Sequence, residues 1–282
     1  MSTFAESTLS TFVASDGDNI VIQDWPLESS AALRGVVILV HGLGEHAGRY
    51  DHVARRLNTW GFAVRGYDQC GHGESGGPRG GLPTDTRLLD DLADIVDSTR
   101  AKMQKGMPLI LLGHSMGGLV VARFVSLAIR PVEGLILSSP ALDPGLSPVQ
   151  KLLLAFLPKL LPNLRVGNGV KPQFISHDPE VVNAYQADRF VHDRISARLG
   201  RFIATAGQKV EELAPRWCVP TLLLYAGDDR LLDPKGSTRF AAAAPKDVVK
   251  AVCFESLYHE IFNELNAEPV FDALKVWIDQ KF

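Results

Sequence analysis

Hydrophobic and polar positions along the chain form a regular succession of strand-like and helix-like patterns. The start alternates with a period of two, in TFVA (11–14) and NIVIQDW (19–25), which predicts two antiparallel strands joined by a turn. Continuous apolar runs, typical of strands buried on both faces, follow at 35–42, 62–68, 108–115, 132–140, 220–227 and 248–255. Amphipathic helical patterns lie between or after them, at 49–61, 85–105, 116–129, 234–244 and 269–281.

Strands that alternate with helices predict an α/β fold with a mostly parallel central sheet and helices on both faces. The alternation stops over residues 141–205, which show no alternating strand pattern and read as mainly helical. We therefore expect a catalytic domain formed by 1–140 and 206–282, interrupted by a helical insertion at 141–205. This insertion is called the cap below.

Composition narrows the function classes. Hydrophobic residues make up 46% of the 282 residues, charged residues 22%, and the net charge is −3, so we expect a sizeable core and no nucleic-acid partner. The first residues show no signal-peptide pattern, and no apolar run approaches the roughly 18 residues of a membrane helix. Three widely spaced cysteines suggest reduced thiols, so we expect a cytoplasmic protein.

The strongest chemical signal is the pattern G-x-S-x-G at 113–117, between a predicted strand and a predicted helix. A sharp strand-to-helix turn holds a serine in a strained conformation, and side chains at its two glycine positions would collide with neighbouring backbone. The turn predicts Ser115 as an exposed nucleophile. It also puts the N–H of Met116 at a helix N-terminus, where developing negative charge is stabilised.

A serine hydroxyl needs a base, and the base needs an orienting acid. In this fold the three follow in the order serine, acid, histidine. Of eight histidines, His259 alone follows the strand at 220–227 and its loop, so chain order selects it. Asp228, Asp229 and Asp233 all follow that strand, and the pattern by itself leaves the choice of acid open.

Together these stretches resemble the monoacylglycerol lipase and lysophospholipase branch of the α/β-hydrolase fold. The resemblance rests on HGLGEHAGRY (41–50), YDQCGHGESGGPRG (67–80), GHSMGG (113–118), GDDRLLDPKG (227–236) and YHEIFNE (258–264), in the family's order. It implies a serine esterase that splits lipid esters, above all monoacylglycerol into fatty acid and glycerol, without a metal or organic cofactor.

Carried over position by position, the resemblance implies Ser115 as nucleophile, His259 as general base and Asp229 as acid, the last from the family's DRL pattern. It also implies an oxyanion hole made by the backbone N–H groups of Leu43 and Met116. Glu45 and Arg49 match polar residues beside the alcohol-binding end of the pocket. A plain i,i+4 ion pair explains those two equally well.

Other functions remain open at this stage. The loop at 42–47 imitates a dinucleotide-binding G-x-G-x-x-A pattern, but an oxidoreductase would leave the serine, aspartate and histidine unexplained. A lysophospholipase, a general carboxylesterase and a serine aminopeptidase share the same motifs. A receptor that binds a ligand without cleaving it is the alternative from a different class.

The apolar segment SPVQKLLLAFLPKLLP (147–162) predicts a capped helix that begins with Ser147 as N-cap and ends or kinks at Pro158. Helical spacing puts Val149, Leu152, Leu153 and Phe156 on one inward face, so Leu152 and Phe156 are expected to contact the substrate. Leu154 is expected to face outward. An apolar residue on that side predicts either transient contact with a membrane surface or burial against the rest of the cap or a partner in a homodimer.

Overall fold

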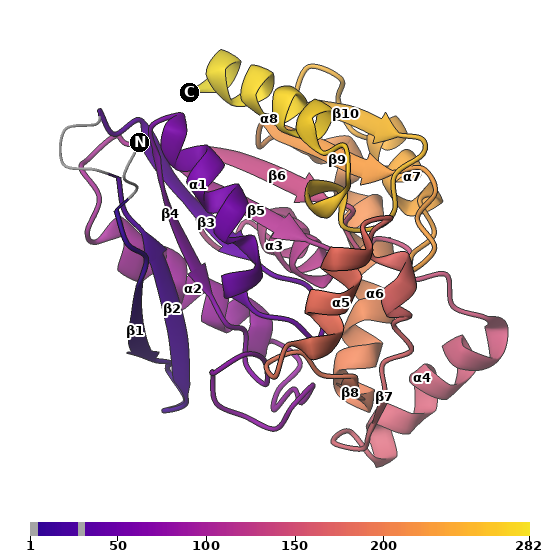
Figure 1. Ribbon diagram of the computed structural model, residues 1–282. Helices are drawn as coiled ribbons and strands as arrows, with labels where there is room; N and C mark the ends of the chain where they lie inside the picture. The colour runs from indigo at the N-terminus through magenta and orange to yellow at the C-terminus, as the bar shows by residue number, and fades with distance from the viewer. Residues whose placement is uncertain (1–4, 28–31) are drawn as a thin grey trace.

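The computed structural model describes residues 5–27 and 32–282 (Figure 1). The first four residues of the stretch in which no signal pattern is found lie outside these ranges. An eight-stranded sheet with the order β1-β2-β4-β3-β5-β6-β9-β10 forms the centre of the molecule. Its strands are β1 (Thr8–Val13), β2 (Asn19–Trp25), β3 (Gly35–Val40), β4 (Phe62–Tyr67), β5 (Leu109–His114), β6 (Gly134–Ser138), β9 (Thr221–Ala226) and β10 (Val249–Phe254).

The sheet is mostly parallel, as predicted. β1 pairs antiparallel with β2, and β2 antiparallel with β4, whereas every pairing from β4 to β10 is parallel. Parallel strands end at the same edge of a sheet, so the loops after β3, β5, β9 and β10 meet there. These four loops carry the residues that the sequence analysis singles out.

Helices cover both faces of the sheet, and each layer has its own core. Alternate side chains of one strand point to opposite faces, so Leu111 of β5 packs in one core and Leu112 in the other. One face is covered by α1 (Asp51–Thr59) and α8 (Glu268–Lys281). The other is covered by α2 (Arg87–Arg100), α3 (Met116–Ser126) and α7 (Lys235–Ala243).

The cap is mainly helical, but it also contains a small sheet that the sequence analysis missed. β7 (Arg165–Gly167) pairs antiparallel with β8 (Arg194–Ser196). Each strand has three residues, too few for a period of two to be recognised. The helices are α4 (Pro148–Leu160), α5 (Pro179–Ala187) and α6 (Ala197–Leu213), and the expected boundary at residue 205 falls within α6.

Helix α4 begins as predicted and ends later. The Oγ of Ser147 accepts the N–H of Gln150, and the side chain of Gln150 accepts the N–H of Ser147, which completes a capping box ahead of Pro148. Pro158 lies inside the helix rather than at its end. Figure 1 shows α4 at the periphery of the molecule, with α6 between it and the central layers.

Within the described ranges, no helix has the length and apolar character needed to cross a membrane.

Candidate active site

Ser115 lies at the tip of a strained turn between β5 and α3. Its backbone has φ 53° and ψ −118°, outside the regions that L-residues normally adopt. A Cβ on Gly113 would lie 2.5 Å from the carbonyl oxygen of Gly117, and a Cβ on Gly117 would lie 2.0 Å from that of Val40. Both glycines are therefore required by close backbone packing, for the reason the sequence pattern suggested.

The structure distinguishes the three aspartates that follow β9. Asp229 is buried, and its Oδ2 lies 2.7 Å from Nδ1 of His259. Its Oδ1 accepts the backbone N–H groups of Leu231 and Leu232 at 2.9 and 3.0 Å. Asp228 instead forms an exposed ion pair with Arg230, and Asp233 accepts the N–H of Lys235 at the start of α7.

The electrostatics of this pair favour a charged carboxylate beside a readily protonated ring. Burial by itself would raise the pKa of Asp229. The facing His259 and the two backbone N–H donors lower this pKa by more than burial raises it, so the net pKa is below its usual value. Burial lowers the pKa of His259, and the facing Asp229 more than offsets this, so the net pKa is raised. An ionised Asp229 accepts only, so the neutral His259 ring carries its proton on Nδ1 and leaves Nε2 as an acceptor.

Ser115 and His259 line one cavity at the carboxyl edge of the sheet. His114, which precedes the serine, packs its ring 4.7 Å from that of His259. Burial and the neighbouring His259 lower the pKa of His114 to about 4, so His114 stays neutral at pH 7. Chain order and the shared cavity thus both select His259 as the candidate base for Ser115.

The loop after β3 presents Leu43 to the same cavity. Nε2 of His41 accepts the N–H of Gln69 at 2.9 Å, so its Nδ1–H donates to the carbonyl of Gly42 at 2.7 Å. In a trans peptide the next N–H points opposite to this carbonyl, which directs the Leu43 N–H away from His41. His41 therefore orients the peptide unit that the resemblance assigns to an oxyanion hole.

Met116, the first residue of α3, lines the cavity as well. Neither its N–H nor that of Leu43 donates a hydrogen bond recorded within the described ranges. Free N–H groups at a helix N-terminus and in an adjoining loop can stabilise a negatively charged oxygen.

Glu45 and Arg49 form the i,i+4 ion pair, and both are buried or nearly so. The carboxylate of Glu45 also accepts the Gly42 N–H and the Tyr50 hydroxyl, both at 2.6 Å. Burial alone would raise the pKa of Glu45, but Arg49 and the nearby histidines lower it to about 2. Glu45 lines the cavity, whereas Arg49 does not and is connected to it through Glu45.

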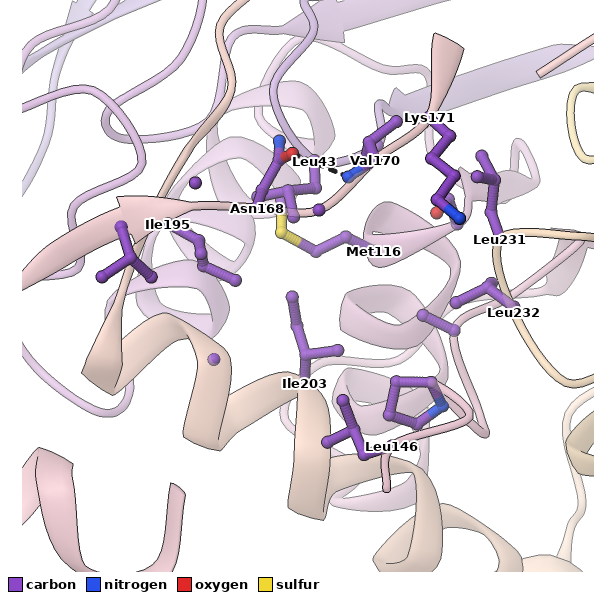
Figure 2. Close-up of a pocket in the computed structure, with 18 of the residues that line it drawn as sticks. Leu43, Met116, Leu146, Asn168, Val170, Lys171, Ile195, Ile203, Leu231 and Leu232 are labelled. Carbon is purple, nitrogen blue, oxygen red and sulfur yellow. Dashed lines mark hydrogen bonds between the residues drawn. The ribbon is translucent and has the colours of Figure 1, made fainter. Parts of the chain in front are cut away.

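The cavity has a volume of about 470 Å³ and extends from Ser115 beneath the cap. Figure 2 shows Leu43 and Met116 on one side, with Ile195, Ile203 and Leu146 from or near the cap around the same space. Leu231 and Leu232, which follow Asp229, close another side. Asn168, Lys171 and Arg230 are polar side chains in the wall away from Ser115 and His259 in the sequence.

The expected substrate contacts of Leu152 and Phe156 are wrong. Their side chains are 62% and 59% exposed and do not line the cavity. The lining residues of α4 are Gln150, Leu153, Leu154 and Leu157. Leu154, expected to face outward, points inward because Gly200 of α6 lets it approach: a Cβ at position 200 would lie 3.0 Å from Leu154 Cδ2.

The sequence analysis also missed how the cap contacts the catalytic loops. The N–H of His192 donates to the carbonyl of Gly44, and its ring Nε2 lies 3.1 Å from the carbonyl of Gly71. The backbone of His192 covers Gly44 so closely that a Cβ there would lie 2.4 Å from the His192 carbonyl oxygen. The loop at 42–47, whose sequence imitates a dinucleotide-binding pattern, is thus covered by the backbone of the cap at His192.

No cluster of three or more histidine, cysteine, aspartate or glutamate side chains suited to a metal ion occurs within residues 5–27 and 32–282.

Comparison with known proteins agrees with this geometry. A family model described as serine aminopeptidase, S33, matches residues 31–266. A monoacylglycerol lipase from Mycolicibacterium smegmatis is 35% identical over 95% of this chain and 95% of its own length. An uncharacterized abhydrolase domain-containing protein from Dictyostelium discoideum is 32% identical over 98% of this chain, which spans only 29% of that longer protein.

Among solved structures, the monoacylglycerol lipase from Paleococcus ferrophilus superposes with a TM-score of 0.81 at 32% identity. The match covers 99% of this chain and 100% of that one. The predicted fold and resemblance are confirmed. From its sheet order to the strained serine turn, this chain is a monoacylglycerol lipase-like α/β-hydrolase and belongs to the serine aminopeptidase S33 family.

Proposed function

We propose that the protein hydrolyses carboxylic esters of lipids, with monoacylglycerol as the preferred class, and releases a fatty acid and glycerol. The observation that carries this proposal is the cavity above Ser115, in whose wall apolar side chains, above all leucine, isoleucine and valine, outnumber polar ones. An acyl chain gains roughly 0.8 kcal/mol per methylene buried in such surroundings. Relatives named monoacylglycerol lipase support the same substrate class.

In the proposed mechanism, Ser115 Oγ attacks the ester carbonyl while Nε2 of His259 takes its proton. Asp229 holds the ring in the required tautomer and stabilises the imidazolium that forms. The N–H groups of Leu43 and Met116 stabilise the oxyanion of the tetrahedral intermediate. His259 then donates its proton to the departing glycerol oxygen, and an acyl group remains on Ser115.

Water completes the cycle by the same route. His259 takes a proton from the water as it attacks the acyl-enzyme, and the proton returns to Ser115 when the fatty acid leaves. The residues assigned to these steps form a complete set, and the proposed reaction uses no metal or cofactor. Glu45, held by its ion pair with Arg49, would face the alcohol portion of the ester.

Residues 141–205 act in this proposal as a cap over the acyl-binding part of the cavity. Val149, Leu152, Phe156 and Leu160 form an exposed apolar face on α4, which we call the outer face. Lipid substrates reside in membranes or aggregates, and exposed apolar patches favour such surfaces. We propose that the outer face makes transient contact with a membrane surface; a homodimer joined through it is the competing outcome.

A substrate panel tests the proposed reaction. Monoacylglycerols of increasing chain length, a lysophospholipid, a short-chain ester and aminoacyl amides are offered to wild type and to Ser115→Ala. Turnover of monoacylglycerols that improves with chain length, and is lost in Ser115→Ala, is the expected result. Loss is expected because alanine lacks the hydroxyl that the proposed mechanism acylates.

Other outcomes identify the alternatives. Turnover of aminoacyl amides alone would replace the lipid proposal by a peptidase, and preference for the lysophospholipid would change the substrate class. Ligand binding without turnover of any compound would favour a receptor. Undiminished turnover by Ser115→Ala would contradict the mechanism itself.

A further inference from the structure

Glu260, the residue after the general base, belongs to a buried charge cluster. Its carboxylate binds the guanidinium of Arg49 through two hydrogen bonds, each of 2.8 Å, and also accepts the side-chain amide of Asn263 at 2.7 Å. The side chain of Glu260 is 7% exposed. Two parallel N–H···O bonds fix both the distance and the relative orientation of the groups they join.

Arg49 extends this connection to the other side of the site. It donates through Nη1 to Glu45, and its guanidinium lies over the ring of Tyr185 in the cap, 4.7 Å from the ring centre. Glu45 in turn accepts the Gly42 N–H, one residue before Leu43. A continuous series of hydrogen bonds therefore runs from the loop of His259, through Glu260, Arg49 and Glu45, to the loop of Leu43.

We propose that Glu260 is a positioning residue for the reaction: through Arg49 and Glu45 it fixes the loop of His259 relative to the oxyanion-hole loop. This inference rests on the proposed roles of Ser115, His259 and Leu43. The sequence motif gives no sign of it, because the ion pair spans 211 positions along the chain.

The cluster also matters for charge. Two carboxylates and one guanidinium carry a net charge of −1, and both carboxylates raise the pKa of the adjacent His259 ring. Attack by Ser115 creates a positive imidazolium and a negative oxyanion together. A negative group behind the ring favours the imidazolium, so the cluster contributes to the transition state as well as to the geometry.

The other titratable and charged groups of the site are the same in a Glu260 variant as in wild type. They are Asp229 after β9, His114 in β5, Glu45, Arg49 and Tyr50 after β3, Tyr185 in α5, and Lys171 and Arg230 in the cavity wall. A change in His259 titration in a Glu260 variant can therefore be assigned to that position.

The His259 loop has supports besides the Glu260 side chain. The backbone N–H of Glu260 donates to the carbonyl of Ile175, and the hydroxyl of Ser176 donates to the carbonyl of Asn263. The carboxylate of Glu264 accepts the Tyr258 N–H. We therefore expect Glu260→Gln, which keeps the shape and removes the charge, to fold.

The test compares Glu260→Gln with Glu268→Gln. Glu268 also forms a two-bonded pair with an arginine, Arg56, but on the surface of α8 away from the cavity. The first readout is the rate of Ser115 labelling by a fluorophosphonate as a function of pH, which needs no lipid substrate. The second is kcat and KM for a short-chain ester and a monoacylglycerol.

In Glu260→Gln we expect the labelling plateau and kcat to fall roughly 10- to 100-fold, with KM changed little, as misplacement of catalytic groups produces. We expect the acid limb of the labelling profile to move to lower pH, because His259 loses a negative neighbour. Glu268→Gln should match wild type in both readouts.

A plateau within twofold of wild type would overturn the proposal. So would a reduced plateau with an unmoved acid limb, since a purely structural defect predicts that result. Failure of the proposed function is recognised separately: wild type would then turn over no ester, or Ser115→Ala would be labelled as fast as wild type.

Discussion

Asp228 and Asp229 are neighbours in the chain with opposite environments. Asp228 is exposed and pairs with Arg230, whereas Asp229 is enclosed by His259 and two backbone N–H groups. A buried carboxylate that accepts three hydrogen bonds stays ionised and fixed. This contrast makes the pair a matched test of the proposed acid.

We predict that Asp229→Asn lowers kcat by about 10⁴, because an amide no longer favours the ring tautomer with a free Nε2. It should also shift the acid limb of kcat/KM to lower pH, since Asp229 is the neighbour that raises the His259 pKa. In wild type that limb should lie above the ordinary histidine value of 6.5, because activity needs the neutral ring and is lost as pH falls through a raised pKa.

The control is Asp228→Asn, which should keep kcat within about twofold because exposed ion pairs contribute little. Steady-state kinetics over a range of pH measures both variants. Equal losses in the two variants, or an acid limb that stays in place in Asp229→Asn, would contradict the assignment of Asp229.

At the scale of elements, α4 shows how a helix with apolar side chains on most of its circumference is oriented. Its contacts with α6 turn Leu154 and Leu157 toward the cavity and leave Leu152 and Phe156 exposed. Helical periodicity predicts a stripe of apolar side chains on this helix, but it does not determine which side of the helix packs against another element. Gly200 decides this, because a small residue lets the leucine of the neighbouring helix come close.

We predict opposite effects for one substitution on the two faces of α4. Leu152→Ser should reduce co-sedimentation with lipid vesicles and leave hydrolysis of a soluble short-chain ester unchanged, since its side chain lies on the outer face. Leu154→Ser should keep vesicle binding, slow turnover of long-chain monoacylglycerols and cost about 1 kcal/mol of stability, as expected for a partly buried leucine.

Vesicle binding, ester kinetics and thermal unfolding of both variants provide the measurements. If wild type does not bind vesicles but sediments as a dimer, and Leu152→Ser dissociates that dimer, the outer face is a dimer interface and not a membrane contact. Indistinguishable behaviour of the two variants would contradict the assignment of the two faces.

At the scale of the whole molecule, several histidines around the catalytic edge are kept neutral because they are buried or half-buried. Burial lowers the pKa of each member of this group, and for His114 and His192 the value falls to about 4; the members are His41, His72, His114 and His192. In the unfolded chain each would take up a proton near pH 6.5. Their protonation therefore favours unfolding.

We predict that the free energy of unfolding falls as pH is lowered from 7.5 to 5. A group with a lowered folded pKa contributes stability above its unfolded pKa, and this is lost as pH falls toward the folded value. Two groups act in the opposite direction: His259, whose pKa is raised by Asp229 against the effect of burial, and Asp91, whose pKa burial raises to about 6. Four histidines outweigh these two.

Urea unfolding followed by circular dichroism at several pH values checks this prediction. A variant such as His192→Asn, which removes one titrating ring at the contact between the cap and the catalytic loops, should show a smaller loss between pH 7.5 and 5. Constant or rising stability on acidification would show that the buried histidines do not control it.

The features of the fold and of the candidate site that could be predicted are those set by residues close together in the sequence. The strand and helix order follows from periodicity, and Gly113, Ser115 and Gly117 reveal their turn because only this arrangement needs two glycines at that spacing. His259 follows from chain order. The acid, in contrast, needed the resemblance, because three nearby aspartates carry the same local pattern and only their burial differs.

The parts that could not be predicted depend on contacts between distant segments. The three-residue strands of the cap exist because each pairs with the other, and the inward face of α4 is set by α6. The connection from Glu260 to Arg49 joins positions 211 residues apart, so neither residue signals it alone.

The sequence by itself determined the fold of this protein and selected Ser115 and His259 as its proposed nucleophile and base. Periodicity, turn sterics and chain order act between residues close together in the chain or fixed by the topology of a parallel sheet. Only the tertiary structure decided which aspartate is buried, which face of α4 meets the cavity and what Glu260 binds. Each of these features depends on side chains that are distant in the sequence, which bury the residue or form its hydrogen bonds. The local sequence pattern does not encode such contacts.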